Sequence, residues 1–170
     1  MLFGNVIRNC GKLRIIMIDK LDRFEIAILR ELQEDATLST LDLSERIGLS
    51  QAPCWRRLNR LRGDGYIRKE VALLDREKVG LGTQVFAHVK LTTHGRTNVA
   101  EFTEATKAHP EITECHILLG TVDALLRVVV RDSNDYQRFF FDCLSRLPGV
   151  QEVNSMVSLS EAKATTALPL

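Results

Sequence analysis

Two different apolar periodicities divide this chain, and they constrain its fold more than any other feature. Over residues 22–62, apolar residues recur every three or four positions, as in amphipathic helices. After Gly82 the pattern changes: residues 84–91 alternate as in a half-buried strand, and helical and strand-like segments then follow one another. The sequence therefore predicts an all-helical N-terminal domain followed by a mixed domain, which makes the chain α+β in class.

Three short helices are predicted in the first region, over residues 22–33, 40–47 and 51–62. Asp22 and Glu25 are spaced as a capping box, with Asp in place of Ser or Thr. Gly48 suits a left-handed end of the second helix, and Ser50 is the expected cap of the third. Residues 66–74 are expected to be extended, and residues 75–82 form a linker with two glycines.

The second region alternates strands and helices in a recognisable order. Strands are predicted over residues 84–91, 112–119, 124–130 and 150–159, and helices over residues 98–108 and 133–147. Pro110 ends the first of these helices, and Ser133 or Asn134 is the expected cap of the second. The order β-α-β-β-α-β predicts a ferredoxin-like sandwich.

The second and third helices, joined by a glycine-containing turn and preceded by another helix, are typical of a helix-turn-helix. Their region is basic: residues 46–69 hold seven basic residues and one acid. If Cys54, Leu58 and Leu61 face the core, the other face of the third helix points outward. The residues expected to reach base edges are Gln51, Ala52, Trp55, Arg56 and Asn59, and those expected to hold phosphates are Ser50, Arg57, Arg60 and Arg62. The alternatives are a three-helix cap with a basic surface and, for Trp55, a core aromatic.

Composition excludes several classes of protein. With 170 residues, 45% hydrophobic and 26% charged, the chain can form a packed core and is not wholly disordered. No apolar run approaches the roughly 20 residues of a membrane helix. The four cysteines, Cys10, Cys54, Cys115 and Cys143, lie far apart, which argues against a disulfide scaffold or a zinc site and favours a reducing cytoplasm.

Residues 1–16 differ from the rest of the chain. Their apolar pieces are interrupted by Arg8, Lys12 and Arg14, so they lack the continuous apolar stretch of a secretory signal. Met17 directly precedes the first helical pattern. We interpret residues 1–16 as an extension and Met17 as the native start.

Several stretches in the right order resemble one family. L-D-R-F-E-I-A-I-L-R-E-L and L-S-E-R-I-G-L-S-Q-A-P-C-W-R-R-L-N-R-L are similar to the helix-turn-helix of Lrp/AsnC (feast/famine) transcription regulators. P-E-I-T-E-C-H-I-L-L-G-T-V-D-A-L-L-R-V-V-V, L-P-G-V-Q-E-V-N-S and K-A-T-T-A-L-P-L resemble the effector-binding domain of that family. The resemblance covers residues 21–170. It implies a winged-type helix-turn-helix domain over 17–66, a connecting strand and linker over 67–82, and an effector-binding and oligomerisation domain over 83–170.

The resemblance also implies partners and a location. Family members bind double-stranded DNA in the cytoplasm, at the nucleoid. They pair through the sandwich domain, often assemble into octamers, and sense small molecules, usually amino acids, between neighbouring dimers. No cofactor or metal is implied.

The resemblance places an effector site on the loop Gly120, Thr121, Val122 and Asp123, together with Ser155, Met156 and Val157. The Asp123 carboxylate suits an α-ammonium, and main-chain N–H groups near Gly120 suit an α-carboxylate. The alternative is a tight turn in which Asp123 caps its own backbone. The family's usual loop is Gly-Asp-Tyr-Asp, so Thr121 and Val122 remove one charge and one aromatic ring. Whether an effector binds, and which one, is left open.

Two other functional classes are alternatives to a DNA-binding regulator. An enzyme would need a nucleophile and a base together, and only Cys115, His116 and Asp123 offer such a set. Neighbours on a strand point to opposite faces, so Cys115 and His116 are not expected to share a site. Sirohaem decarboxylases resemble the same family but do not need a basic recognition helix. The third class is a sensor or assembly module that does not bind DNA.

Overall fold

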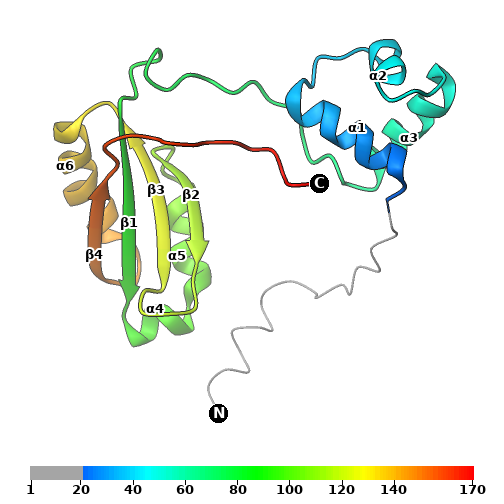
Figure 1. Cartoon of the computed structure of the whole chain (residues 1–170). Coiled ribbons are helices and arrows are strands. Elements are labelled where there is room, and N and C mark those ends of the chain that lie inside the picture. Colours follow the sequence, from blue (N-terminus) through cyan, green and yellow to red (C-terminus); the bar gives the residue numbers. More distant parts are fainter. Residues whose placement is uncertain (1–20) are drawn as a thin grey trace. The chain divides into compact units, whose positions relative to one another are not determined.

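The structure, a computed structural model, describes residues 21–170, which divide into two compact units (Figure 1). The N-terminal unit contains the described residues as far as Leu73 together with Lys163–Leu170, and the C-terminal unit is Leu74–Ala162. Residues 1–16, interpreted above as an extension, and Met17, interpreted as the native start, lie outside the described residues. Within the described part of the chain, no helix is long and apolar enough to cross a membrane.

The N-terminal unit is built on the three predicted helices, α1 (Arg23–Glu34), α2 (Thr40–Arg46) and α3 (Gln51–Gly63). The capping box is present: the Asp22 carboxylate accepts hydrogen bonds from the Phe24 and Glu25 N–H groups, each 2.8 Å long. The Glu25 carboxylate in turn accepts a 2.9 Å bond from the Asp22 N–H. These bonds satisfy main-chain donors that the first turn of a helix leaves free.

The apolar stripes of the helices meet in one small core. Ile28, Leu43, Cys54, Leu58 and Leu61 are buried there, at 0 to 4% exposure, and Ile47 and Leu49 pack against them. Gly48, with a φ of +69°, ends α2 and turns the chain into α3. The helix-turn-helix predicted from the sequence is therefore confirmed.

Three details of this unit and of the segment that follows α3 differ from expectation. Ser50 occupies the N-cap position of α3, but its side chain makes no capping hydrogen bond. Residues 64–82 contain no paired strand, so the expected connecting strand is not formed. The last eight residues group with the N-terminal unit, because Arg30 and Gln33 of α1 bind the main chain of the tail. The Leu170 carbonyl accepts a 2.8 Å hydrogen bond from Arg30 Nε, and the Leu168 carbonyl accepts a 3.2 Å bond from Gln33 Nε2.

The C-terminal unit has the predicted β-α-β-β-α-β order. Its elements are β1 (Thr83–Leu91), α4 (Thr93–Thr97), α5 (Val99–Lys107), β2 (Ile112–Ile117), β3 (Ala124–Val130), α6 (Ser133–Asp142), the 3-10 turn Leu144–Arg146, and β4 (Val150–Val157). The four strands form one antiparallel sheet in the order β2-β3-β1-β4. The short helix α4 was not expected. The N-cap of α6 is Asp132, which accepts from the Asp135 N–H, rather than Ser133 or Asn134.

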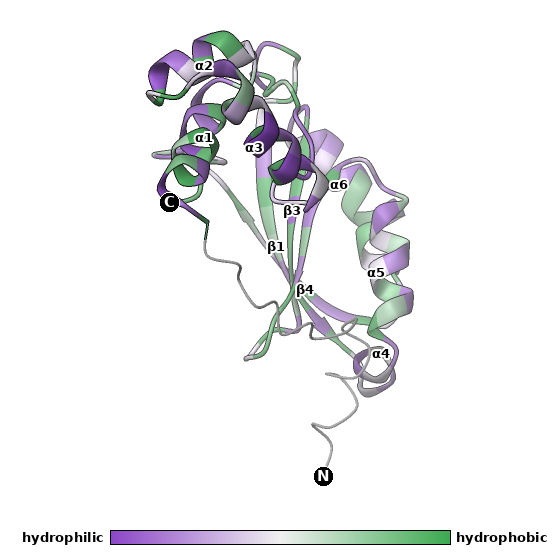
Figure 2. Ribbon diagram, turned by 90° about the vertical axis from the view of Figure 1, so that its right-hand side faces the viewer, coloured by the Kyte–Doolittle hydropathy of each residue, from purple (hydrophilic) through white to green (hydrophobic). Residues whose placement is uncertain are grey.

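One face of the sheet is covered by helices, and the other is open within this unit. Helices α4, α5 and α6 lie on the same side of the strands (Figure 2). Alternate residues of β1 and β3 are buried on that side, where they form a core with Phe102, Phe139 and Leu144. Residues on the opposite face, such as Phe86, Leu125 and Met156, are half-buried or exposed.

Candidate functional site

The outward face of α3 is the first candidate site. Gln51, Ala52, Trp55, Arg56 and Asn59 are all exposed, whereas Cys54, Leu58 and Leu61 are buried. All five predicted base-reading residues therefore lie on the solvent side of one helix. With 56% of its surface exposed, Trp55 is not a core aromatic, so that alternative was wrong.

The arginines of α3 divide into two groups. Arg57 forms an ion pair with Asp22 at 3.2 Å and lies over the Phe24 ring, and Arg60 forms a 2.8 Å ion pair with Glu25. Arg62 is paired with Glu70. Arg56, in contrast, makes no ion pair with any described residue and is exposed. To bind phosphates, the paired arginines would have to give up or share their ion pairs inside the unit. Arg56 would not have to break an ion pair in order to bind DNA.

The ion pair of Arg57 belongs to the cap of α1. The main-chain N–H of Glu25, together with the Arg57 guanidinium, lowers the pKa of the Asp22 carboxyl from its ordinary value. A lowered folded-state pKa stabilises the domain above the ordinary carboxyl pKa, and this contribution is lost as pH falls through the folded value. Arg57 thus helps to position α3 against α1.

The second candidate site is the loop between β2 and β3. Asp123 ends this loop with its side chain 22% exposed. The carboxylate accepts a 2.8 Å bond from the Leu91 N–H and is paired with Arg96 at 3.0 Å. Asp123 therefore binds the end of β1 and helix α4, not its own backbone as the turn alternative required. Gly120 and Thr121 are exposed.

The predicted residues of β4 do not lie with this loop in one chain. Asp123 is next to the Val89–Leu91 end of β1, whereas Ser155, Met156 and Val157 pair with Ala87, Phe86 and Val85 on its other edge. Ser155 faces α6 and Met156 faces the open side of the sheet, because neighbours on a strand alternate. The structure thus separates the predicted effector residues into two groups.

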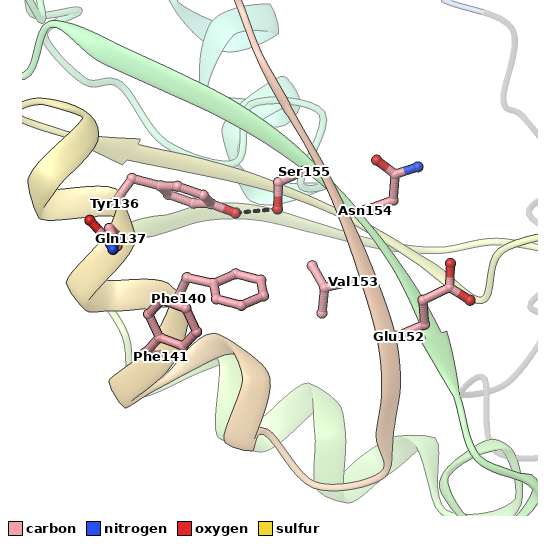
Figure 3. Close-up of a pocket in the computed structure, with 8 residues that line it drawn as sticks. All are labelled: Tyr136, Gln137, Phe140, Phe141, Glu152, Val153, Asn154 and Ser155. Carbon is pink, nitrogen blue, oxygen red and sulfur yellow. Dashed lines mark hydrogen bonds between the residues drawn. The ribbon is translucent and has the colours of Figure 1, made fainter.

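A pocket of about 480 Å³ lies between α6 and β4 (Figure 3). The Tyr136 hydroxyl and the Ser155 hydroxyl share a hydrogen bond at its wall, and burial raises the pKa of Tyr136. Phe140 and Val153 point toward each other across it, while Glu152 and Asn154 point away from α6. The remaining lining residues are Gln137 and Phe141.

No residue of the Gly120–Asp123 loop lines this pocket. Sequence reasoning included Ser155 but missed the aromatic residues of α6, whose pattern indicated only a packed helix.

The candidate enzyme residues are not brought together. Cys115 faces the helix-covered core, where burial raises its pKa, and pairs with Leu126 across the ladder. His116 is next to Leu125 and lies near Glu114, on the other face. The expectation that Cys115 and His116 point apart is confirmed.

Comparisons with known proteins match both units. Residues 21–68 match a family model described as winged helix-turn-helix DNA-binding, and residues 84–168 match one described as the Lrp/AsnC ligand binding domain. The chain is 40% identical over 154 residues to the glutamate uptake regulatory protein of Zymomonas mobilis, covering 91% of this chain and 93% of the relative. It is 36% identical over 148 residues to the leucine-responsive regulatory protein of Klebsiella pneumoniae, covering 87% and 90%. The chain belongs to the Lrp/AsnC family of transcriptional regulators.

Solved Lrp/AsnC structures agree with this membership. A transcriptional regulator from Neisseria meningitidis, crystallised with L-methionine, superimposes with a TM-score of 0.84 at 39% identity, covering 88% of this chain and 96% of that one. An AsnC family regulator from Agrobacterium tumefaciens gives a TM-score of 0.82 at 40% identity, covering 87% and 96%. These relatives are regulators, so the comparisons do not favour the sirohaem decarboxylase alternative. The match of the helical unit to a DNA-binding model also counts against a module without DNA binding.

Removing the Arg60 guanidinium is expected to destabilise the helix-turn-helix unit. The Glu25 side chain is only 5% exposed, and Arg60→Ala would leave its Oε1 without a cation. Because Arg60 is itself half exposed, we expect a loss of about 1 kcal/mol in the free energy of unfolding, measured by urea denaturation. Arg56→Ala, on the same helix but without an ion pair, is the matched control and should change it by less than about 0.5 kcal/mol. Equal effects of the two variants would show that the Glu25 pair adds nothing.

Proposed function

We propose that this regulator binds specific DNA through the outward face of α3 and that an amino acid modulates the binding. The observation that carries the proposal is the set of five exposed side chains, Gln51, Ala52, Trp55, Arg56 and Asn59, on one side of the second helix of a helix-turn-helix. Arg suits guanine, and Gln or Asn suits adenine, in the major groove. The predicted phosphate contacts are Ser50, Arg57, Arg60 and Arg62.

We further propose that two chains pair through the open face of the sheet. Phe86, Leu125 and Val129 are half-buried there, and Met156 is 46% exposed. His88 and Arg127 lie on the same face, which is therefore mixed in character. Its apolar side chains would be removed from water if a second sheet packed on it at about 10 Å. A dimer places two copies of α3 on a pseudo-palindromic site, with half-sites one or more helical turns apart. Assembly of such dimers into octamers is the family expectation.

An amino-acid effector is supported by the ligand-binding family model and by the L-methionine complex of the Neisseria regulator. We propose that the effector site includes Gly120–Asp123 of one chain and Ser155, Met156 and Val157 of another, since a single chain keeps these groups apart. Asp123 uses its carboxylate for Leu91 and Arg96, and a carboxylate has about four acceptor positions, so capacity for an α-ammonium remains.

The test is a mobility shift of the full chain on the DNA upstream of its own gene. It is carried out at two salt concentrations, with and without a mixture of amino acids. We expect a specific shift that weakens steeply with salt and changes with the mixture. Asp123→Ala should lose the response to the mixture and keep effector-free DNA binding. Glu161→Ala, which removes an exposed carboxylate outside the proposed site, should keep both. Loss of DNA binding in Asp123→Ala would show a purely structural residue.

A further inference from the structure

Trp55 is not part of the hydrophobic core of the helical unit. The core positions of α3 are filled by Cys54, Leu58 and Leu61, at 0 to 4% exposure, whereas Trp55 is 56% exposed. Its indole makes no hydrogen bond or ring contact with any described residue. The largest apolar side chain of the helix is thus directed to solvent, where its apolar surface is unfavourable.

The neighbours of Trp55 show which surface it belongs to. Ala52, Arg56 and Asn59 lie one turn before it, beside it and one turn after it, and all are exposed. Side chains on a helix lean toward its N-terminus, so the indole extends toward the turn that holds Ala52. The small methyl of Ala52 does not cover the ring. The outward face of α3 therefore combines the exposed apolar indole ring of Trp55 with polar side chains.

In the major groove, the apolar group on a base edge is the 5-methyl of thymine, and the other features are hydrogen-bond donors and acceptors. We propose that Trp55 is a specificity-determining residue that selects thymine at one position of each half-site by packing on this methyl group. The inference rests on the proposed function of α3. The alternative is that the indole N–H donates a hydrogen bond to a phosphate. Such a contact would carry no sequence information.

Thymine-to-uracil substitution tests this proposal, because uracil lacks only the methyl group. A binding site is selected from random duplexes with the full-length wild-type protein, and each thymine is then replaced by uracil in turn. We expect one position per half-site at which affinity falls about fourfold, the equivalent of one buried methyl group. Trp55→Ala should bind the thymine and uracil forms of that position equally.

Two further variants make the result specific. Trp55→Phe keeps an apolar ring without the N–H and should keep sensitivity to uracil, and Arg56→Ala should also keep it. Since Trp55 is exposed, its variants should unfold at the wild-type temperature. The proposal is overturned if the wild type is indifferent to uracil at every position, or if Trp55→Ala keeps the full sensitivity. Selection of no sequence at all by the wild type would overturn the proposed function as well, so the two failures are distinguishable.

Discussion

Replacing Arg56 by alanine is expected to weaken binding to the specific site by about 1–3 kcal/mol, or roughly 5- to 150-fold. Arg56 is exposed on the outward face of α3 and makes no ion pair with any described residue. Its guanidinium is therefore free to bind a guanine edge through two hydrogen bonds without breaking a bond inside the protein. Gln51→Ala is expected to act in the same range on an adenine contact.

The measurement is the affinity for the selected site and for a random duplex, at the same salt concentration. Arg56→Ala should lower the ratio of the two affinities, because base contacts carry the discrimination. Arg60→Ala serves as the comparison and should weaken both duplexes about equally, provided that it is measured below its unfolding temperature. If Arg56→Ala kept the wild-type ratio, the assignment of Arg56 to a base would be wrong.

The second large effect is expected at Gly149, where the chain turns into β4. Gly149 has a φ of +75°, and a Cβ added there would lie 2.6 Å from Gly95 Cα in helix α4. The two glycines let the backbones touch, and the Gly149 carbonyl accepts a 2.8 Å bond from the Thr92 N–H at this contact. Left-handed strain and the backbone overlap together should cost about 2–5 kcal/mol in the free energy of unfolding for Gly149→Ala.

Alanine substitutions at two other glycines distinguish the left-handed strain from the backbone overlap when unfolding is measured by heat or urea. A Cβ at Gly95 would lie 2.8 Å from the Gly149 carbonyl oxygen, but Gly95 has no positive φ, so Gly95→Ala reports the overlap alone. Gly120 has no positive φ, and a Cβ added there would meet no other residue within 4 Å beyond its chain neighbours, so Gly120→Ala should be nearly neutral. A loss below about 1 kcal/mol for Gly149→Ala would mean that the contact relaxes at little cost.

Local signals explain why most elements were predictable. The capping box of Asp22 and Glu25 and the left-handed Gly48 are short-range features, so the limits of α1 and α2 follow from them. Helix α4 was missed because its five residues bury only Gly95, so the sequence has no apolar periodicity to detect there. The connecting strand expected after α3 is absent from residues 64–82 for a different reason. Extended preference alone makes no strand unless another strand pairs with it.

The sequence by itself determined which residues face outward on α3. The apolar positions Cys54, Leu58 and Leu61 mark the buried face, and the 3.6-residue period then places the other residues around the helix. Only the tertiary structure showed that Arg57 and Arg60 are bound to acids of α1 and that Arg56 is free. It alone placed Ser155 beside Tyr136 and away from Asp123. Periodicity is local to a segment, whereas ion pairs and pockets depend on segments distant in sequence that meet only after folding.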